Sequence, residues 1–179
     1  MLTITVPAVE MWDESKEEFV SSKEQTLFLE HSLVSLSKWE SRQHKSFLFT
    51  KELTYEETID YIKCMTLNEV DQEVYSHLTK SNFDEIYKYI KDPMTATTFR
   101  NENNRRNNVE IVTAELIYYW MFSLGIPYEC REWHLNQLIA LIRVCSIKNT
   151  PSKKMSKRQI MSQNAALNAA RRQKFNTKG

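Results

Sequence analysis

Glycine is almost absent from this chain of 179 residues, which contains only Gly125 and the terminal Gly179. Phosphate-binding loops need several glycines, because their backbone adopts positive φ angles and passes close to the ligand. Neither a P-loop nor a dinucleotide-binding fingerprint can be drawn on this chain. The sequence therefore disfavours nucleotide-dependent chemistry, and we expect no cofactor.

Long apolar runs and paired cysteines are lacking as well. No stretch approaches the roughly 20 apolar residues that cross a bilayer. Residues 1–13 contain no basic leader followed by an apolar block, so we expect neither a membrane partner nor a signal peptide. Cys64, Cys130 and Cys145 are odd in number and irregularly spaced, which indicates no disulfide framework. A reducing cytosol is the expected compartment.

Acidic residues are missing from the end of the chain. No Asp or Glu follows Glu132, so residues 1–132 contain all 23 acidic residues and 14 of the 24 basic ones. The formal charge is therefore −9 up to Glu132 and +10 from Trp133 onward. Such an asymmetry indicates a tail that binds a partner, or a tail that folds back on its own body.

The N-terminal segment has the alternation of a β-hairpin. Apolar residues alternate with threonines over 2–6, and further apolar residues flank a polar turn. After this hairpin the apolar period becomes helical. Ser21 and Glu24 match a capping box, which predicts a helix over about 22–42 with Trp39 on its core face.

Capping residues followed by apolar residues at helical spacing predict the further helices. Three short amphipathic helices are expected to start at Thr54, Asp71 and Asn82. Two more apolar helices, over 114–124 and 133–147, have the composition of central core helices. Helices as short as the first three need tertiary packing to be stable in water.

The expected fold class is mainly α with a minor β component. Residues 1–148 form a helical bundle-like domain, long enough to bury a core. A second hairpin near 97–112 is compatible with the polar loop there, whose flanks have strand character. Residues 149–179 form a linker and a basic, alanine-rich helical tail. We expect Trp120 and Trp133 to be buried in the domain.

Two groups of residues are candidate sites for chemistry. Cys130 and His134 stand one helical turn apart, but a structural zinc site needs four ligands, so two ordinary core-helix residues are the favoured interpretation. Glu56, Glu57 and Asp60 lie on adjacent turns, where capping and the helix dipole already explain acidic residues. No nucleophile motif is present. We expect no catalytic residues, no metal site and no enzymatic activity.

Two groups of residues are candidate partner-binding sites. The aromatic group consists of Tyr118, Tyr119, Trp120 and Phe122. Such a run more often belongs to the core than to the surface, although one face of the helix can be core while another binds a partner. The basic group of the tail consists of Lys153, Lys154, Lys157, Arg158, Arg171 and Arg172. A basic helix can bind nucleic-acid phosphates. The acidic body would repel them, so a helix that faces solvent or a protein partner is favoured.

Six segments are distinctive as strings rather than as chemical motifs, and together they span nearly the whole chain. They are EHSLVSLSKWE at 30–40, ETIDYIKCMTL at 57–67, PMTAT at 93–97, LIYYWM at 116–121, WHLN at 133–136 and AALNAARR at 165–172. These segments resemble a family of proteins encoded by long-tailed bacteriophages and prophages. Members of this family are described as tail assembly chaperones or as uncharacterised tail proteins.

The resemblance implies a non-enzymatic role in the host cytoplasm during virion assembly. Such chaperones coat the tape measure protein, a very long helical chain with exposed apolar stripes. They keep it soluble while tail tube subunits polymerise around it. The implied partners are thus the tape measure protein and the tail tube protein. The opposite charges of body and tail would let copies associate head to tail as a homo-oligomer.

Two other classes of function stay open. One is a virion structural protein, such as a connector or tail-completion component. The other, less favoured, is a nucleic-acid-binding regulator. In many long-tailed phages the chaperone also exists in a frameshift-extended form, and the codons of Lys153 and Lys154 could contain the slippery adenine run that this requires.

Overall fold

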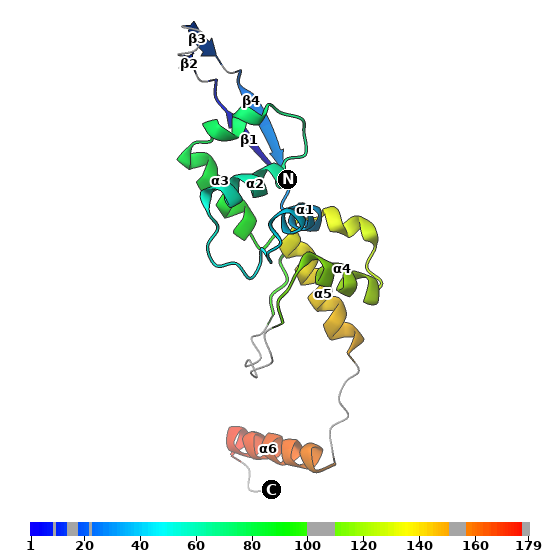
Figure 1. Cartoon of the computed structure of the whole chain (residues 1–179). Coiled ribbons are helices and arrows are strands. Elements are labelled where there is room, and N and C mark those ends of the chain that lie inside the picture. The colour runs from blue at the N-terminus through cyan, green and yellow to red at the C-terminus, as the bar shows by residue number, and fades with distance from the viewer. Residues whose placement is uncertain (9, 14–17, 22, 100–109, 151–156, 177–179) are drawn as a thin grey trace. The chain divides into compact units, whose positions relative to one another are not determined.

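The computed structural model describes residues 1–8, 10–13, 18–21, 23–99, 110–150 and 157–176. It divides into two compact units, Met1–Ser146 and Ile147–Gly179. The boundary expected from the sequence, between 148 and 149, lies two residues further along the chain. The fold class is mainly α with a small β component, as predicted (Figure 1).

The predicted N-terminal hairpin is present as two paired segments. Strand β1 (Leu2–Val6) pairs antiparallel with β4 (Gln25–Leu29). Strand β2 (Glu10–Asp13) pairs antiparallel with β3 (Glu18–Ser21). In Figure 1 the two strand pairs follow one another along the same hairpin.

The helix predicted over about 22–42 is wrong in its first half. Residues 25–29 are strand β4, in which Leu27 lies opposite Ile4 of β1, and both side chains are buried. Helix α1 covers only Leu33–Gln43. The conformation of 25–29 depends on pairing with a strand about 20 residues earlier, which local periodicity cannot reveal.

Three helices begin at a hydroxyl N-cap with a reciprocal capping box. The caps are Ser32 for α1, Thr54 for α2 (Tyr55–Met65) and Thr79 for α3 (Lys80–Lys91). The cap of α2 agrees with the prediction, whereas Ser21 does not cap α1. Asn82 does not start α3 but is its third residue, and its side chain bonds back to Thr79.

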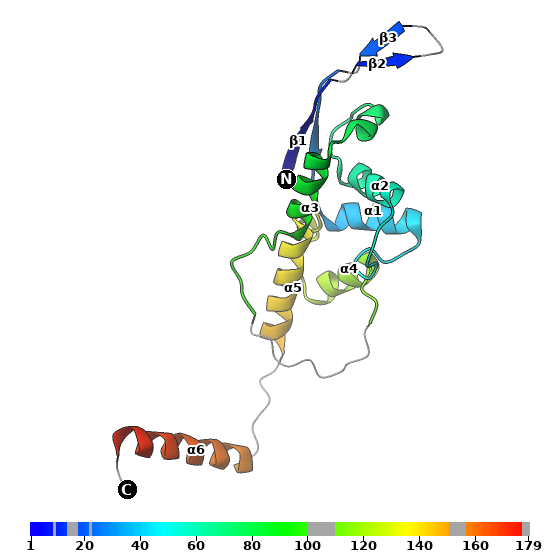
Figure 2. The ribbon, with the colours of Figure 1, turned by 90° about the vertical axis from the view of Figure 1, so that its left-hand side faces the viewer.

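Two apolar cores share α1, which lies between α2 and α4 in Figure 2. The first core joins β1, β4, α2, the 3₁₀ helix η1 (Gln72–His77) and α3 around Trp39, which is fully buried as predicted. The second core joins α4 (Ala114–Ser123), the 3₁₀ helix η2 (Tyr128–Glu132) and α5 (Leu135–Asn149) to Leu33 and Leu36 of α1.

The burial predicted for Trp133 is wrong, because this side chain is 42% exposed. Trp133 follows η2 in an extended conformation, with φ −69° and ψ 162°. Successive side chains of extended backbone point to opposite sides, so His134 enters the core and Trp133 points out. The burial predicted for Trp120 is confirmed only in part, because this side chain is half-buried against the second core.

The remaining predictions concern the polar loop and the tail. Residues 100–109 of the proposed second hairpin lie outside the described residues, and the described flanks 97–99 and 110–112 contain no strand. The tail forms helix α6 (Lys157–Phe175). Among the described helices, none combines the length and apolarity that a bilayer-spanning segment requires.

Candidate protein-binding surfaces

A buried carboxylate of α1 fixes the start of α4. Glu40 Oε2 accepts a hydrogen bond from the Ala114 N–H at 2.7 Å, and Oε1 accepts one from the Phe47 N–H at 2.9 Å. Burial raises the pKa of Glu40, although the two N–H donors act in the opposite direction. Thr113, the N-cap of α4, makes no side-chain cap bond. The Glu40 carboxylate therefore helps to orient α4.

The aromatic residues predicted as a candidate site are divided by the helical period of α4. Ile117 and Met121 face the core and are almost fully buried. Tyr119 and Phe122, on the other side of the helix, are 65% and 64% exposed. Tyr118 is half-buried between these two sides. The run is therefore core on one face and an exposed aromatic surface on the other.

Helix η2 adds two residues to this surface that sequence reasoning missed. The ring of Tyr128 stacks on Phe122, with centroids 6.1 Å apart and planes at 14°, and lies 6.3 Å from Tyr118. The Arg131 guanidinium carbon lies 4.0 Å from the centroid of Tyr128, and its Nη1 donates to the Tyr128 hydroxyl. We call these residues the α4–η2 aromatic surface: Tyr118, Tyr119, Phe122, Tyr128 and Arg131.

Contacts among the residues of the α4–η2 aromatic surface make it rigid and so reduce the conformational entropy that it loses on binding. Burial raises the pKa of Tyr118, so its hydroxyl is neutral at physiological pH. The Arg131 guanidinium lies over the face of the Tyr128 ring, where the ring quadrupole stabilises its positive charge. Aromatic rings that already contact each other lose little conformational entropy when a partner binds. The surface is thus suited to bind an apolar side chain.

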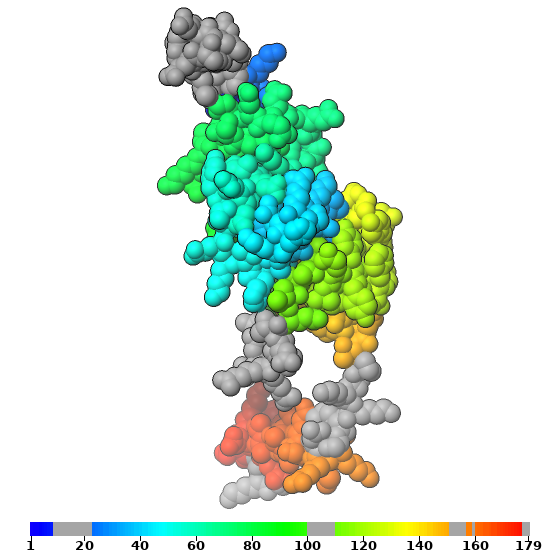
Figure 3. Space-filling model, in the orientation of Figure 1, coloured from blue at the N-terminus to red at the C-terminus, as the bar shows by residue number. Residues whose placement is uncertain are grey.

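A second apolar surface lies beside α3. This cavity of about 660 Å³ is bounded by α2, α3 and residues 47–53. In Figure 3 the segment after α1, in cyan, meets α3, in green, on the visible face of the first unit. We call this cavity the α3 groove. Its apolar lining residues are Phe47, Leu53, Ile62, Phe83, Ile86 and Ile90.

The basic candidate residues belong to the tail unit. Lys157, Arg158, Arg171 and Arg172 lie on α6, in which every side chain whose burial is described is exposed. Lys153 and Lys154 lie outside the described residues. At about 100° per residue, Ile160, Leu167 and Phe175 share one face of α6 with Lys157 and Arg171. That face combines apolar and cationic groups, and an acidic partner with an apolar patch would match it.

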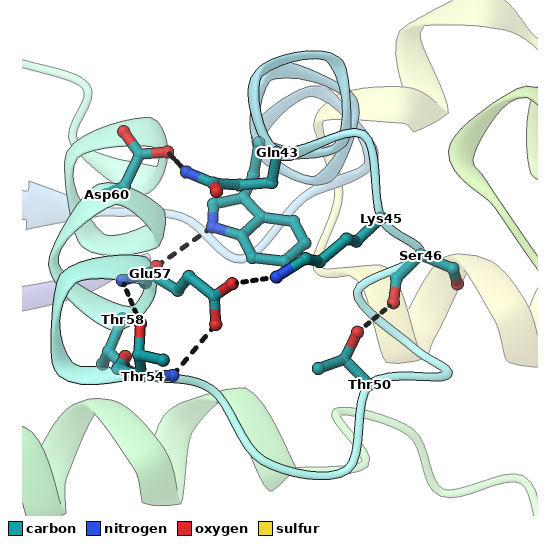
Figure 4. A network of polar contacts seen from close by, with 9 residues as sticks. Gln43, Lys45, Ser46, Thr50, Thr54, Glu57, Thr58 and Asp60 are labelled. Carbon is teal, nitrogen blue, oxygen red and sulfur yellow. Dashed lines mark hydrogen bonds and ion pairs between the residues drawn. The ribbon is translucent and has the colours of Figure 1, made fainter.

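Two acidic residues of α2 make structural contacts, Glu57 at the start of the helix and Asp60 with α1. Glu57 accepts hydrogen bonds from the Thr54 N–H at 2.9 Å and from Lys45 Nζ at 2.6 Å (Figure 4). Bonding to Lys45, together with the Thr54 N–H, lowers the pKa of Glu57. Asp60 accepts a hydrogen bond from Gln43 at 3.0 Å. The capping interpretation of Glu57 is therefore confirmed.

His134 takes part in a buried polar cluster rather than in a pair with Cys130. Its Nε2 lies 3.1 Å from the Tyr89 carbonyl oxygen, and its ring centroid lies 5.1 Å from that of His31. His31 Nδ1 lies 2.5 Å from the Tyr61 hydroxyl. Burial, and secondarily the proximity of His134, lowers the pKa of His31 to about 3. Within the described residues, no three potential metal ligands come together.

The fold and these surfaces define a mainly helical protein with two outward-facing apolar surfaces and a basic helical tail. A scan against protein-family models matched none, and searches of curated proteins and of solved structures gave no significant match. The function therefore has to be inferred from the surfaces themselves and from the sequence.

Proposed function

We propose that this protein is a phage tail assembly chaperone that binds the tape measure protein in the host cytoplasm and keeps it soluble during tail morphogenesis. The observation that carries the proposal is the α4–η2 aromatic surface. Tyr119 and Phe122 are about two-thirds exposed on a helix whose opposite face is fully buried. The resemblance of six segments to tail assembly chaperones supplies the identity of the partner.

The physical argument concerns what such a surface can recognise. Contiguous exposed aromatic residues are characteristic of protein-binding surfaces, because they gain free energy when a partner removes them from water. An unassembled tape measure chain presents apolar helical stripes that would otherwise associate with each other. A chaperone that covers these stripes acts by binding, and we infer that catalysis has no part in its role.

Charge supports association of several copies along one partner. Residues 1–132 carry a formal charge of −9 and the rest of the chain +10. Opposite charges on the two parts of one chain favour head-to-tail contacts between copies. We therefore expect a homo-oligomer on the tape measure protein, and the tail tube protein is a further expected partner at the end of assembly.

Co-expression with the tape measure protein tests the proposal. The wild-type chain should increase the soluble fraction of the tape measure protein, and the double substitution Tyr119→Ala with Phe122→Ala should abolish most of that increase. Ile111→Ala, which truncates an exposed apolar side chain outside the surface, is the matched control and should behave as wild type. A soluble fraction that does not respond to the wild-type chain would overturn the chaperone role.

Purified virions distinguish the chaperone from a structural component. A chaperone is released when the tube is complete, so the chain should be absent from finished particles or present far below stoichiometric amounts. Stoichiometric recovery from washed particles would instead establish a connector or tail-completion component. Salt-sensitive DNA binding that requires residues 153–179 would indicate the regulator.

A further inference from the structure

Three of the hydroxyl groups that line the α3 groove are hydrogen-bonded within the chain. Thr50 Oγ1 donates to the Ser46 carbonyl at 2.7 Å, and Thr58 Oγ1 donates to the Thr54 carbonyl at 2.9 Å. The Tyr61 hydroxyl is bonded to His31. Small-molecule sites usually contain polar groups that converge on the ligand. Here these three hydroxyls are bonded within the chain, and the lining between them is apolar, which suits an apolar ridge of a partner.

The shape of the groove follows two turns of α3. Phe83, Ile86 and Ile90 lie at helical spacing along it, and Ile62 of α2 closes the floor. Apolar residues at such a spacing on a second helix would match this lining, as in complexes in which an amphipathic helix occupies a groove. An extended strand would present its side chains at a different period.

Charged residues of α3 mark the two ends of the groove. Asp84 and Lys91 both line it, and they are one heptad apart, about 10 Å along the helix. Lys91 Nζ lies 4.0 Å from the centroid of the Tyr87 ring, so the ammonium group is held at the rim. Lys51 and Glu52 on the facing segment are adjacent and of opposite sign. Because Lys51 and Glu52 together add no net charge, Asp84 and Lys91 are the charges that distinguish one end of the groove from the other.

We propose that the α3 groove binds one amphipathic helix of a partner protein, whose apolar stripe is flanked by a basic residue that faces Asp84 and an acidic residue that faces Lys91. This inference rests on the proposed function only in taking the partner to be a helical protein. It adds a second binding surface to the α4–η2 aromatic surface, and it specifies the charge pattern of the segment that is bound.

Designed peptides test this charge pattern. Three helical peptides of about five turns share one apolar stripe and differ only in the two flanking residues: one Lys and one Glu, two Glu, or two Lys. Fluorescence anisotropy with the full chain at low salt should show the mixed peptide binding about threefold more tightly than either of the others. Equal affinities, or no binding of any peptide, would overturn the proposal.

Charge reversal at each end should change the preferred peptide. Asp84→Lys places cations at both ends and should make the two-Glu peptide the best ligand, while Lys91→Glu should favour the two-Lys peptide. Glu85→Lys is the matched control, because it makes the same charge change on the adjacent exposed residue of α3, which does not line the groove. If Glu85→Lys changes the preferred peptide in the same way as Asp84→Lys, then the net charge of the protein alone determines the affinity, and the proposal fails.

The outcome for the groove is separable from the outcome for the chaperone. If the peptide preferences switch as expected while the tape measure protein stays insoluble with the wild-type chain, the groove binds helices and the proposed function fails. If the wild-type chain keeps the tape measure protein soluble but the peptides bind equally, the groove proposal fails and the chaperone role stands on the α4–η2 aromatic surface.

Discussion

Helices α1 and α6 represent two opposite ways in which this sequence forms a helix. Helix α1 has eleven residues, and its side chains Trp39, in the first core, and Leu33 and Leu36, in the second, are fully buried. Helix α6 has 19 residues, and its described side chains are exposed. A helix as short as α1 needs tertiary contacts, whereas α6 relies on alanine and other strong helix formers. The comparison shows that helical pattern and burial are separate properties.

Of the changes that test this comparison, substitution of Trp39 in α1 should have the largest effect on the free energy of unfolding. Its ring packs against Phe47 and Tyr61, and its Nε1 donates to the Glu57 carbonyl at 3.0 Å. Trp39→Ala should lower the free energy of unfolding by about 4 kcal/mol, because it leaves a large cavity and removes the hydrogen bond to the Glu57 carbonyl. Urea unfolding followed by circular dichroism measures the change.

Trp133→Ala is the matched control for that measurement, because Trp133 is 42% exposed. It should cost about 1 kcal/mol or less. If Trp39→Ala does not fold, Trp39→Phe keeps a ring in the core and should still cost about 2 kcal/mol, since the indole donor is lost. Equal costs at Trp39 and Trp133 would contradict the assignment of Trp39 to the centre of the first core.

Some of these differences could be predicted from the sequence, and others could not. The position of α2 follows from a capping box, and the burial of Trp39 follows from the 3.6-residue period of the apolar residues; both are local properties. The division of the aromatic run could have been predicted too, because Ile117 and Met121 are four residues apart and Phe122 falls outside their face. Strand β4 could not be distinguished from a helix, because its pairing with β1 is non-local.

The binding surfaces were also only partly predictable. Tyr119 and Phe122 were identified as candidates, although core was the favoured role. Tyr128 and Arg131 were missed, because a 3₁₀ turn after Pro127 brings them beside α4, and no sequence motif encodes that contact. The α3 groove was missed for a similar reason, since the irregular segment 47–53 forms one of its walls.

Mild acid should destabilise the unit that contains α1 and leave α6 unchanged. His31, directly before the N-cap of α1, has its pKa lowered by burial to about 3, so it is neutral in the folded state and takes up a proton on unfolding below about pH 6.5. The unfolded state then binds more protons than the folded state, so the free energy of unfolding decreases as the pH decreases. Between pH 7 and pH 5 this should remove about 2 kcal/mol from the free energy of unfolding.

Urea unfolding at the two pH values measures this loss, with His31→Gln as the control. The substitution abolishes titration at this position, so the loss between pH 7 and pH 5 should shrink even if the variant is less stable at both. His134, whose pKa is also lowered by burial, should contribute to what remains, and Glu40, whose pKa is raised by burial, should act in the opposite direction. Helix α6 contains no histidine and no acidic residue, so its helicity should not change in this range. An unaltered pH dependence in His31→Gln would refute the role of His31.

Removal of α6 should have the smallest effect on stability. Truncation after Asn149 leaves α5 complete and deletes the basic tail, whose described side chains are exposed. Because the two cores consist of residues up to Cys145, the melting temperature should stay within about 2 °C of the full-length value, which corresponds to about 1 kcal/mol at most. Differential scanning calorimetry of both chains at equal concentration measures the shift. A much lower melting temperature would mean that α6 contributes to the folded body, and the contrast between α1 and α6 would no longer hold.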